Sequence, residues 1–329
     1  MKLLAGDVGG THTRLAVFTS ESGPRAALFQ KGYSNSEYQS FEEVVKGFLV
    51  EADTQVDGGC IGVGGPVVSG RVSFTNLDWV IDAEDLRSAF AWSSFTLLND
   101  MEALAYGVTV LESDQLHTLS AGKPVPGGPI AILALGTGLG EGYLTHDGQR
   151  YRAHGCEGGH TSFGPVGGPQ IGLLHYMNGQ GYDHVSYERV CSGSLGVPNM
   201  YEYLKQTGLE EPDWLAERLE DADDPTPVIM EAALDERRGC ELAGRTLGML
   251  VEILGAEAGN LALKILATGG VYVGGGMSQH ILPKLKNPAF LEAMRSKGRF
   301  RELVTSMPVH VILDPHAGLW GAAVRGLEG

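Results

Sequence analysis

The sequence predicts an α/β protein with two domains that face a common cleft. Strand and helix patterns alternate over the first hundred residues, and a unit of strand, glycine-rich turn and strand occurs once in each half, at 3–18 and at 130–145. The 329 residues also exceed the usual size of one hydrophobic core. We therefore expect two α/β domains, each with one such turn, and a boundary near 105–115.

Composition limits the partners of this chain. Hydrophobic residues make up 43% of it, which is ample for sizeable cores, and its net charge is −16. Nucleic acids and anionic membrane surfaces demand clustered Lys and Arg, so neither is expected as a partner. The four separated cysteines form no C-x-x-C motif, which favours free thiols in a reducing compartment. With no signal peptide and no uninterrupted apolar run of bilayer length, a soluble, cytoplasmic protein is expected.

The first glycine-rich turn joins two apolar strands. It contains Gly9 and Gly10, which allow close approaches that a Cβ would block. Successive N–H groups can then point at an anion, and the hydroxyls of Thr11 and Thr13 would add donors. Asp7, at the end of the first strand, could hold Mg²⁺ through water. The turn suits a nucleotide's phosphates, and the alternative is a tight hairpin that binds nothing.

A second turn of the same kind favours phosphate binding. The apolar strand at 130–135 runs into Gly136-Thr137-Gly138-Leu139-Gly140, and the chain leaves again through 143–145. The two units look like a weak internal duplication, and their turns could close on one polyphosphate from opposite sides. A P-loop and a dinucleotide-binding unit are disfavoured, because the chain has no G-x-x-x-x-G-K-[ST] and no glycine-rich turn that opens a helix with an acidic residue about twenty positions on.

The other elements follow from hydrophobic spacing. In the first half we expect a strand at 26–33, a helix over 41–49, a buried strand at 59–66, a hairpin at 67–74, a helix that Asp82 caps and that runs through Phe90, and a strand at 95–100 followed by a helix. In the second half we expect a hairpin turn at Asp147-Gly148, a helix that starts near Asp183, long helical patterns from 228 to about 262, strands at 271–276 and 309–314, and a final helix over 317–327.

Acidic and amide side chains could form the site for the hydroxyl compound that accepts a phosphoryl group. Asn99-Asp100 lies where a strand ends and a helix begins, so it is either an N-cap or an amide next to a general base that accepts a proton from a hydroxyl. Glu157 and His160 lie on a glycine-rich loop, where a polyol fits better than a metal. Glu188, early in a helix, is either part of a solvated helical face or, in the company of Glu157, a member of this set. The set matches a neutral acceptor dense in hydroxyl groups.

Together these motifs resemble the bacterial glucokinase family, the ATP-dependent, non-zinc group of the actin-like sugar kinases. The resemblance covers essentially the whole chain. It rests on G-D-V-G-G-T at 6–11, T-N-x-x-W at 75–79, L-N-D at 98–100, G-T-G-L-G at 136–140, E-G-G-H at 157–160 and the Gly274-Gly275-Gly276 turn.

The fold that this resemblance implies is the two-domain actin-like ATPase (ribonuclease H-like) fold with an interdomain cleft. A small α/β domain would cover 1–110, and a C-terminal helix at about 316–329 would return to it. A large α/β domain would cover 111–315. A homodimer fits the family.

The activity that the resemblance implies is transfer of the γ-phosphoryl group of ATP to the 6-hydroxyl of glucose, which gives glucose 6-phosphate and ADP. Asp100 would be the catalytic base, and Asp7 would organise Mg²⁺ through water. The residues that would hold the sugar are Gly65, Asn76, Asn99, Asp100, Glu157, His160 and Glu188. Those that would bind ATP are Gly6, Asp7, Val8, Gly9, Gly10, Thr11, Thr137, Gly138 and Gly275, with Gly274 to Gly276 bordering the adenosine.

Some features depart from the family pattern or leave alternatives. His12 stands where close relatives often carry Asn, and Glu141, directly after G-T-G-L-G, is expected to point away from the phosphates. The Cys-rich zinc loop of the related repressor-like sugar kinases is missing. The alternatives are a kinase for another hexose or an N-acetyl amino sugar, a non-catalytic sugar sensor, and a chaperone or filament ATPase of the same fold.

Overall fold

The computed structural model describes residues 1–74 and 77–328. Asn76, one of the predicted sugar ligands, lies outside the described residues. The chain divides into two compact units. Unit 1 consists of Met1–Gln115, Gly142–Gly155 and Asp314–Gly329, and unit 2 consists of Leu116–Glu141 and Cys156–Leu313. The C-terminal segment belongs to unit 1. The segment 142–155 also groups with unit 1, which differs from its assignment above to the second domain.

Unit 1 is built on a five-stranded sheet of order β3-β2-β1-β4-β7. Strand β1 pairs antiparallel with β2 and parallel with β4, and β4 pairs parallel with β7. A separate two-stranded sheet pairs β5 with β6. The strands of unit 1 are β1 (Lys2–Val8), β2 (His12–Thr19), β3 (Phe29–Ser34), β4 (Gly58–Val63), β5 (Arg71–Ser73), β6 (Val80–Asp82) and β7 (Ser94–Asn99).

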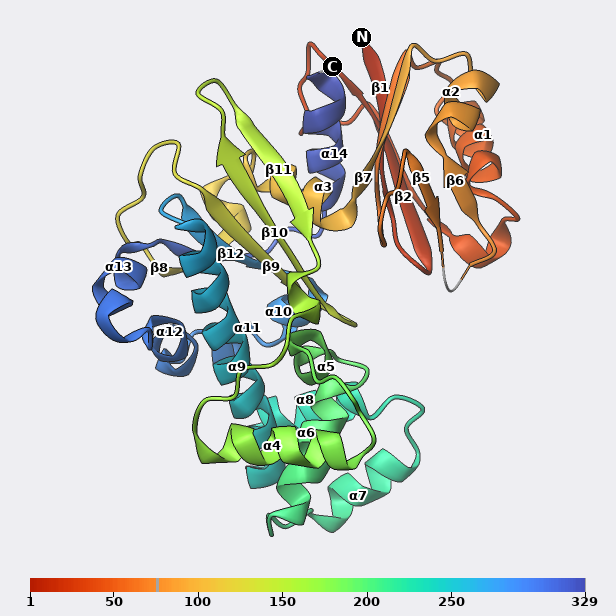
Figure 1. Cartoon of the computed structure of the whole chain (residues 1–329). Coiled ribbons are helices and arrows are strands. Elements are labelled where there is room, and N and C mark those ends of the chain that lie inside the picture. Colours follow the sequence, from red (N-terminus) through yellow and green to blue (C-terminus); the bar gives the residue numbers. More distant parts are fainter. Residues whose placement is uncertain (75–76, 329) are drawn as a thin grey trace. The chain divides into compact units, whose positions relative to one another are not determined.

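Both faces of this sheet are covered by helices, which explains why its central strands are continuous apolar runs. On one face, Leu4 and Val8 of β1 pack in a core with α1 (Phe41–Glu51) and α2 (Ala83–Ala89). On the other, Leu3 and Ala5 pack in a core with α3 (Asp100–Val108) and α14 (Ala317–Leu327). Figure 1 shows these helix pairs on opposite sides of β1. The predicted helices at 41–49, 82–90 and 317–327 are confirmed, with Asp82 as the N-cap of α2.

The backbones of α3 and α14 approach closely through two glycines. A Cβ on Gly107 would collide with the carbonyl group of Ala317, and a Cβ on Gly321 would collide with that of Ala103. The helix that begins with Asp100 is thereby packed directly on the C-terminal helix, which fixes the orientation of its first turn.

The hairpin predicted at 67–74 forms only in part. A bridge joins Val68 to Arg71 across Ser69 and Gly70, which both have positive φ. Beyond this turn the chain enters β5, whose partner is β6 and not the residues before the turn.

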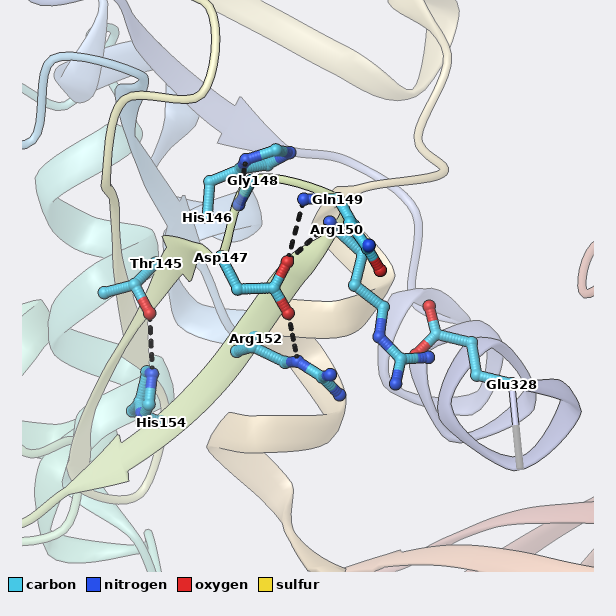
Figure 2. Close-up of polar contacts among 9 residues, drawn as sticks. All are labelled: Thr145, His146, Asp147, Gly148, Gln149, Arg150, Arg152, His154 and Glu328. Carbon is cyan, nitrogen blue, oxygen red and sulfur yellow. Dashed lines mark hydrogen bonds and ion pairs between the residues drawn. The ribbon is translucent and has the colours of Figure 1, made fainter.

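The predicted hairpin turn at Asp147-Gly148 is confirmed, and it is tied to the C-terminal helix (Figure 2). It joins β10 (Leu139–His146) to β11 (Tyr151–Cys156). The Asp147 carboxylate accepts hydrogen bonds from the backbone N–H groups of Gln149 and Arg150 and from Arg152 Nε, and these bonds hold the pKa of Asp147 well below its usual range. Arg150 forms an ion pair with Glu328 at 3.1 Å, just after α14.

Unit 2 is built on a sheet of order β11-β10-β9-β12-β13-β8, whose first two strands run into unit 1. Strand β12 pairs parallel with β9 and with β13, and β8 is antiparallel to β13. The other strands are β8 (Leu116–Ser120), β9 (Ile130–Leu135), β12 (Gly270–Gly274) and β13 (Val309–Ile312). The helices are α4 (Gly167–Gly179), α5 (Tyr187–Cys191), α6 (Gly196–Gln206), α7 (Asp213–Glu220), α8 (Pro225–Leu234), α9 (Glu241–Ile265), α10 (Gly276–His280), α11 (Leu282–Leu285), α12 (Pro288–Arg295) and α13 (Arg301–Ser306).

Two helix boundaries differ from the sequence prediction. The pattern from 228 to 262 is divided between α8 and α9, because the chain turns at 235–240, where Gly239 has a φ of 59°. Helix α5 begins after Ser186, whose side chain caps it by accepting from the N–H of Arg189, and not near Asp183. Both signals, an αL glycine and a serine cap, were present in the sequence.

Helix α9 is the core helix of unit 2. Its sixteen buried residues pack against α6, α8 and α12, and Gly255 and Gly259 leave room for the backbone of α12. By length and composition α9 is apolar enough to cross a membrane, but 78% of its apolar window is buried in the protein. This burial is that of a core helix.

Candidate functional site

In unit 1, three functional segments follow neighbouring parallel strands. Val8 at the end of β1 is in register with Val63 at the end of β4, and Val63 is in register with Asn99 at the end of β7. Parallel strands present their carboxyl ends at the same edge of a sheet, where ligands of open α/β sheets bind. The glycine-rich turn, the turn at 64–66 and Asn99-Asp100 therefore line one edge of the sheet.

The first turn is closed by backbone bonds and by a buried amide that the sequence analysis missed. The N–H of Gly9 donates to the carbonyl of His12 at 3.0 Å. Asn35, which is 1% exposed, donates from Nδ2 to the carbonyl of Gly9 at 2.9 Å and accepts the hydroxyl of Thr13 at 2.7 Å. The expectation that Thr13 offers a donor to an anion is therefore wrong, because its side chain is buried and occupied. Thr11 stays exposed, with its hydroxyl 2.9 Å from Nδ1 of His12.

The two turn glycines leave open space. A Cβ on Gly10 would meet no atom within 4 Å, and one on Gly9 would meet only the carbonyl oxygen of His12 at 3.6 Å. Neither φ lies in the left-handed region. Neither packing nor backbone conformation explains these glycines, so the space left by their missing side chains fits a phosphate close to the backbone.

Gly6 and Val8 have a different environment from the turn. A Cβ on Gly6 would approach Ile61 and Leu15 to 2.6 and 2.7 Å, so this glycine serves the packing of the sheet. Val8 is 1% exposed. Neither Gly6 nor Val8 therefore offers a side chain to ATP, and only their backbone atoms are left for such a contact.

Asp7 lies between the turn and the start of α14. Its carboxylate is 3.8 Å from the guanidinium of Arg14, and a Cβ on Gly318 would lie 3.9 Å from its Cγ. Burial raises the pKa of Asp7, and the positive charges of Arg14 and His316 oppose this rise. About a third of the side chain is accessible, at 35% exposure, which leaves a carboxylate oxygen for a hydrated cation. Carboxylate chemistry at this edge fits Mg²⁺.

Asn99 is an N-cap, as the simpler reading of the sequence proposed, and it also holds a second turn. Its Oδ1 accepts from the N–H of Met101 at 2.9 Å, and Glu102 completes a capping box. Its Nδ2 donates to the carbonyl of Gly65 at 3.0 Å. An amide has two N–H donors, so one is left over for a ligand. Gly65 has a φ of 118°, which only glycine adopts readily.

Asp100 is the exposed first residue of α3. Its Oδ1 lies 2.8 Å from the N–H of Met101, and a Cβ on Gly64 would lie 3.9 Å from its Oδ2. Negative charge is favourable at a helix N-terminus. The structure thus brings Gly65, Asn99 and Asp100 together.

In unit 2 as well, two glycine-rich segments follow the ends of neighbouring parallel strands. Gly274 of β12 is in register with Ala134 of β9, so the turn at 136–140 and the Gly274–Gly276 segment follow at one edge. The second turn is closed by the N–H of Gly136, which donates to the carbonyl of Gly138 at 2.9 Å. Gly275, with a φ of 90°, packs against the backbone of Leu135, where a Cβ would collide.

A serine-rich segment supports this turn, and the sequence analysis did not identify it. The N–H of Gly193 donates to the carbonyl of Gly136 at 3.1 Å, and the hydroxyl of Ser194 donates to that of Thr137 at 3.3 Å. The buried hydroxyl of Thr226 donates in turn to the carbonyl of Gly193. The available signal was the Ser-Gly-Ser run at 192–194.

The predicted acid-rich set of unit 2 is assembled around one imidazole. His160 Nε2 lies 2.7 Å from Glu188 Oε2 and 3.8 Å from Glu157 Oε2. Glu188 also packs against Gly138, where a Cβ would come within 2.7 Å of its carboxylate, so the polyol-type set adjoins the second turn. His160 and Glu157 are largely exposed, at 61% and 71%, and their polar atoms are open to a ligand.

Glu141 is not one of these exposed residues. Its side chain is directed into the interior of unit 2 and is only 1% exposed.

The comparisons with known proteins agree with this arrangement. A family model described as glucokinase matches residues 4–328. The chain belongs to the glucokinase family. A glucokinase of Nostoc punctiforme is 39% identical to it over 336 aligned positions, which cover 98% of each protein.

Solved structures extend the likeness to glucokinases over the whole fold. The crystal structure of a glucokinase from an Antarctic psychrotroph has a TM-score of 0.86 at 26% identity and covers 100% of this chain and 99% of that chain. A glucokinase of the ROK family from Streptomyces griseus, solved in complex with glucose and AMPPNP, has a TM-score of 0.63 at 22% identity, with 100% of both chains covered. The predicted α/β fold of the two-domain actin-like ATPase type is confirmed.

Proposed function

We propose that this protein transfers the γ-phosphoryl group of ATP to the 6-hydroxyl of glucose. Membership of the glucokinase family supports the reaction class. The observation that carries the assignment of roles is the common register of β1, β4 and β7, which sets a phosphate-type turn and Asn99-Asp100 at one sheet edge.

Asp100 is the base of the proposed reaction. Its carboxylate accepts the proton of the 6-hydroxyl while that oxygen attacks the γ-phosphorus, and the bond from phosphorus to the oxygen of the departing ADP breaks. Asn99 donates its remaining amide N–H to a neighbouring sugar hydroxyl. Gly65 contributes the backbone of the turn that Asn99 holds.

The acid-rich set of unit 2 holds other hydroxyls of the sugar. A carboxylate accepts two hydroxyl protons, and an imidazole donates or accepts, so Glu157, His160 and Glu188 can together recognise several hydroxyl groups. Asn76 is proposed to join them on the resemblance alone.

ATP is proposed to bind at the two glycine-rich turns. The first turn offers the open space beside Gly9 and Gly10 and the exposed hydroxyl of Thr11, and Thr137, Gly138 and Gly275 belong to the matching turns of unit 2. Mg²⁺ held through water by Asp7 would neutralise phosphate charge.

A screen of sugars with coupled detection of ADP tests the substrate. We expect turnover with glucose and MgATP and much weaker turnover with mannose, fructose and N-acetyl amino sugars. Equal turnover of several hexoses would contradict strict glucose specificity and would favour a general hexose kinase. Glucose binding without ADP release would favour a sugar sensor.

Replacement of Asp100 tests the base. We expect Asp100→Asn to lower kcat by about 10²- to 10⁴-fold, which is the usual contribution of a positioned base, and to leave the Kd for glucose within a few-fold of wild type. Asp114→Asn removes an exposed carboxylate elsewhere in unit 1 and is the control. Unchanged turnover in Asp100→Asn would exclude Asp100 as the base.

We further propose a cytoplasmic homodimer, which fits the family. Light scattering of the purified protein during size exclusion measures the mass, and a monomer at micromolar concentration would contradict the dimer.

A further inference from the structure

A buried carboxyl group lies beneath the proposed sugar-binding loop. Glu141 is the third residue of β10, its side chain is 1% exposed, and neither carboxylate oxygen has a hydrogen-bond partner within the described residues. Buried polar side chains nearly always have partners, so an unpartnered glutamate requires an explanation.

The glycine-rich loop at 157–160 packs closely against the start of β10. A Cβ on Gly158 would collide with the carboxylate of Glu141, and a Cβ on Gly159 would collide with the carbonyl of Leu139. The Cys156 thiol adds a weak contact to the carbonyl of Glu141 at 3.5 Å. Two glycines between Glu157 and His160 are thus explained by close packing on Leu139 and Glu141.

The charges around Glu141 oppose its ionisation. Burial and the nearby carboxylate of Glu257 raise the pKa of Glu141 to about 8, and Lys264 only partly offsets them. Glu257 is fully buried, accepts from Asn260 Nδ2 at 2.8 Å and lies 3.4 Å from Lys264 Nζ, so the nearest cation already has a partner.

The other titratable neighbours provide no counter-charge. Burial raises the pKa values of the Cys156 and Cys191 thiols, and nearby carboxylates, Glu141 among them, raise these values further. At neutral pH both thiols are therefore neutral, and Lys264 is in contact with Glu257.

We propose that Glu141 is a positioning residue whose neutral carboxyl group supports the Cys156–His160 segment, and that loss of its proton displaces this segment and weakens sugar binding. The proposal rests on the proposed function of Glu157 and His160. An unpartnered buried carboxylate is strongly unfavourable. Of the elements that enclose it, β10 and α9 are fixed in the core, so the glycine-rich loop yields and admits water.

The experiment compares wild type, Glu141→Gln and Glu252→Gln. Glutamine keeps the shape of the side chain and cannot ionise. Glu252 is an exposed carboxylate on α9 and is the matched control. The Kd for glucose is measured by calorimetry and the KM for MgATP by the coupled assay, from about pH 6 to about pH 10.

We expect the pH to affect the Kd for glucose through Glu141 and not the KM for MgATP. Above about pH 8 the Kd of wild type and of Glu252→Gln for glucose rises by up to about tenfold per pH unit, and that of Glu141→Gln does not. The KM for MgATP follows the same pH profile in all three proteins. A merely structural role would give Glu141→Gln the alkaline rise of wild type, and that result overturns the proposal.

Two readouts do not depend on glucose. Infrared difference spectra between pH 7 and pH 10 should show loss of a protonated carboxyl C=O band in wild type that is missing in Glu141→Gln. Hydrogen exchange reports the loop through the amides of His160 and Thr161, which donate to Glu157 and Gly158. The protection of these amides, relative to their intrinsic exchange rates, should fall above about pH 8 in wild type and in Glu252→Gln but not in Glu141→Gln.

These readouts separate the two hypotheses. If wild type neither binds nor phosphorylates glucose at pH 7 but shows the band and the loss of protection, the proposed function fails and the support of the loop by Glu141 stands. If glucose is phosphorylated but the band is missing or the protection is constant, the inference fails. Should Glu141→Gln not fold, the band and the exchange of wild type decide between these outcomes.

Discussion

The side-chain amide of Asn99 donates a hydrogen bond to the carbonyl oxygen of Gly65 at 3.0 Å, and this bond fastens the turn after β4 to the start of α3. The same side chain caps the helix that begins with Asp100. One residue thus determines both where the carboxylate of Asp100 lies and where the adjoining turn lies. The two functions can be separated by mutation.

We expect Asn99→Ala to lower the free energy of unfolding by about 1–3 kcal/mol, because the cap and the partner of the Gly65 carbonyl are both lost. We also expect the KM for glucose to rise by about tenfold, because an amide donor to the sugar is removed. Urea unfolding and steady-state kinetics measure the two effects.

Asp82→Ala is the matched control for Asn99→Ala. Asp82 caps α2 through the N–H groups of Glu84 and Asp85, so its loss should cost about 0.5–2 kcal/mol of stability and leave the KM for glucose unchanged. If both variants show the same KM, Asn99 acts only as a cap.

Two glycines of the first motif should respond to alanine in opposite ways. Gly10→Ala meets no neighbour, so stability should be retained while kcat/KM for ATP falls by up to about 10²-fold, because a phosphate is displaced. Gly6→Ala overpacks against Leu15 and Ile61 and should lose about 1–3 kcal/mol of stability. Full ATP affinity in Gly10→Ala would show that the open space receives no phosphate.

The imidazole of His160 should matter for the sugar and not for the nucleotide. His160→Gln loses the 2.7 Å contact with Glu188, so we expect the KM for glucose to rise by about 10- to 100-fold with little change in the KM for ATP. His146→Gln, at the exposed hairpin, is the control and should match wild type. A shift of both KM values in His160→Gln would indicate a general disturbance of unit 2.

The parts of the fold that the sequence predicted are those governed by local pattern. The apolar strands, the Asp82 cap, the Asp147-Gly148 hairpin turn and the final helix depend on residues within a few positions of one another. The hydrogen bond from Thr13 to Asn35 joins residues 22 positions apart, and no local sequence pattern predicts it. The alternation of β2 did place Thr13 on the buried face with Leu15, which was a signal against a role on the surface.

The candidate site was predictable in its residue types and not in its contacts. Asn99, Asp100, Glu157 and His160 were identified by their positions after strands and on a glycine-rich loop. The bond of Asn99 to Gly65 depends on the register of β4 and β7, and the place of Asp100 depends on the packing of α3 against α14. The contact of His160 with Glu188 joins the glycine-rich loop to α5, which lies further along the chain. Glu141 is the clearest case, because its burial depends on two glycines 17 and 18 positions further on.

The buried carboxyl of Glu141 should make stability depend on pH in a defined window. Its pKa is about 8 in the folded protein and about 4.5 when the chain is unfolded, so unfolding releases a proton between these values and wild type loses stability as the pH rises. Relative to Glu141→Gln, the loss should approach about 1.4 kcal/mol per pH unit and should reach roughly 5 kcal/mol near pH 8. Above pH 8 the carboxyl is ionised in both states, and the difference should level off.

Urea unfolding of wild type, Glu141→Gln and Glu252→Gln at several pH values measures this difference. Glu252 is exposed, so its replacement should leave the pH dependence of wild type unchanged. The pH range over which stability changes lies below the pH range over which sugar binding changes. Stability responds to the proton that is released on unfolding, whereas binding responds to the protonation of the folded state. A stability difference between wild type and Glu141→Gln that is constant from about pH 5 to about pH 8 would mean that Glu141 is ionised in the folded protein.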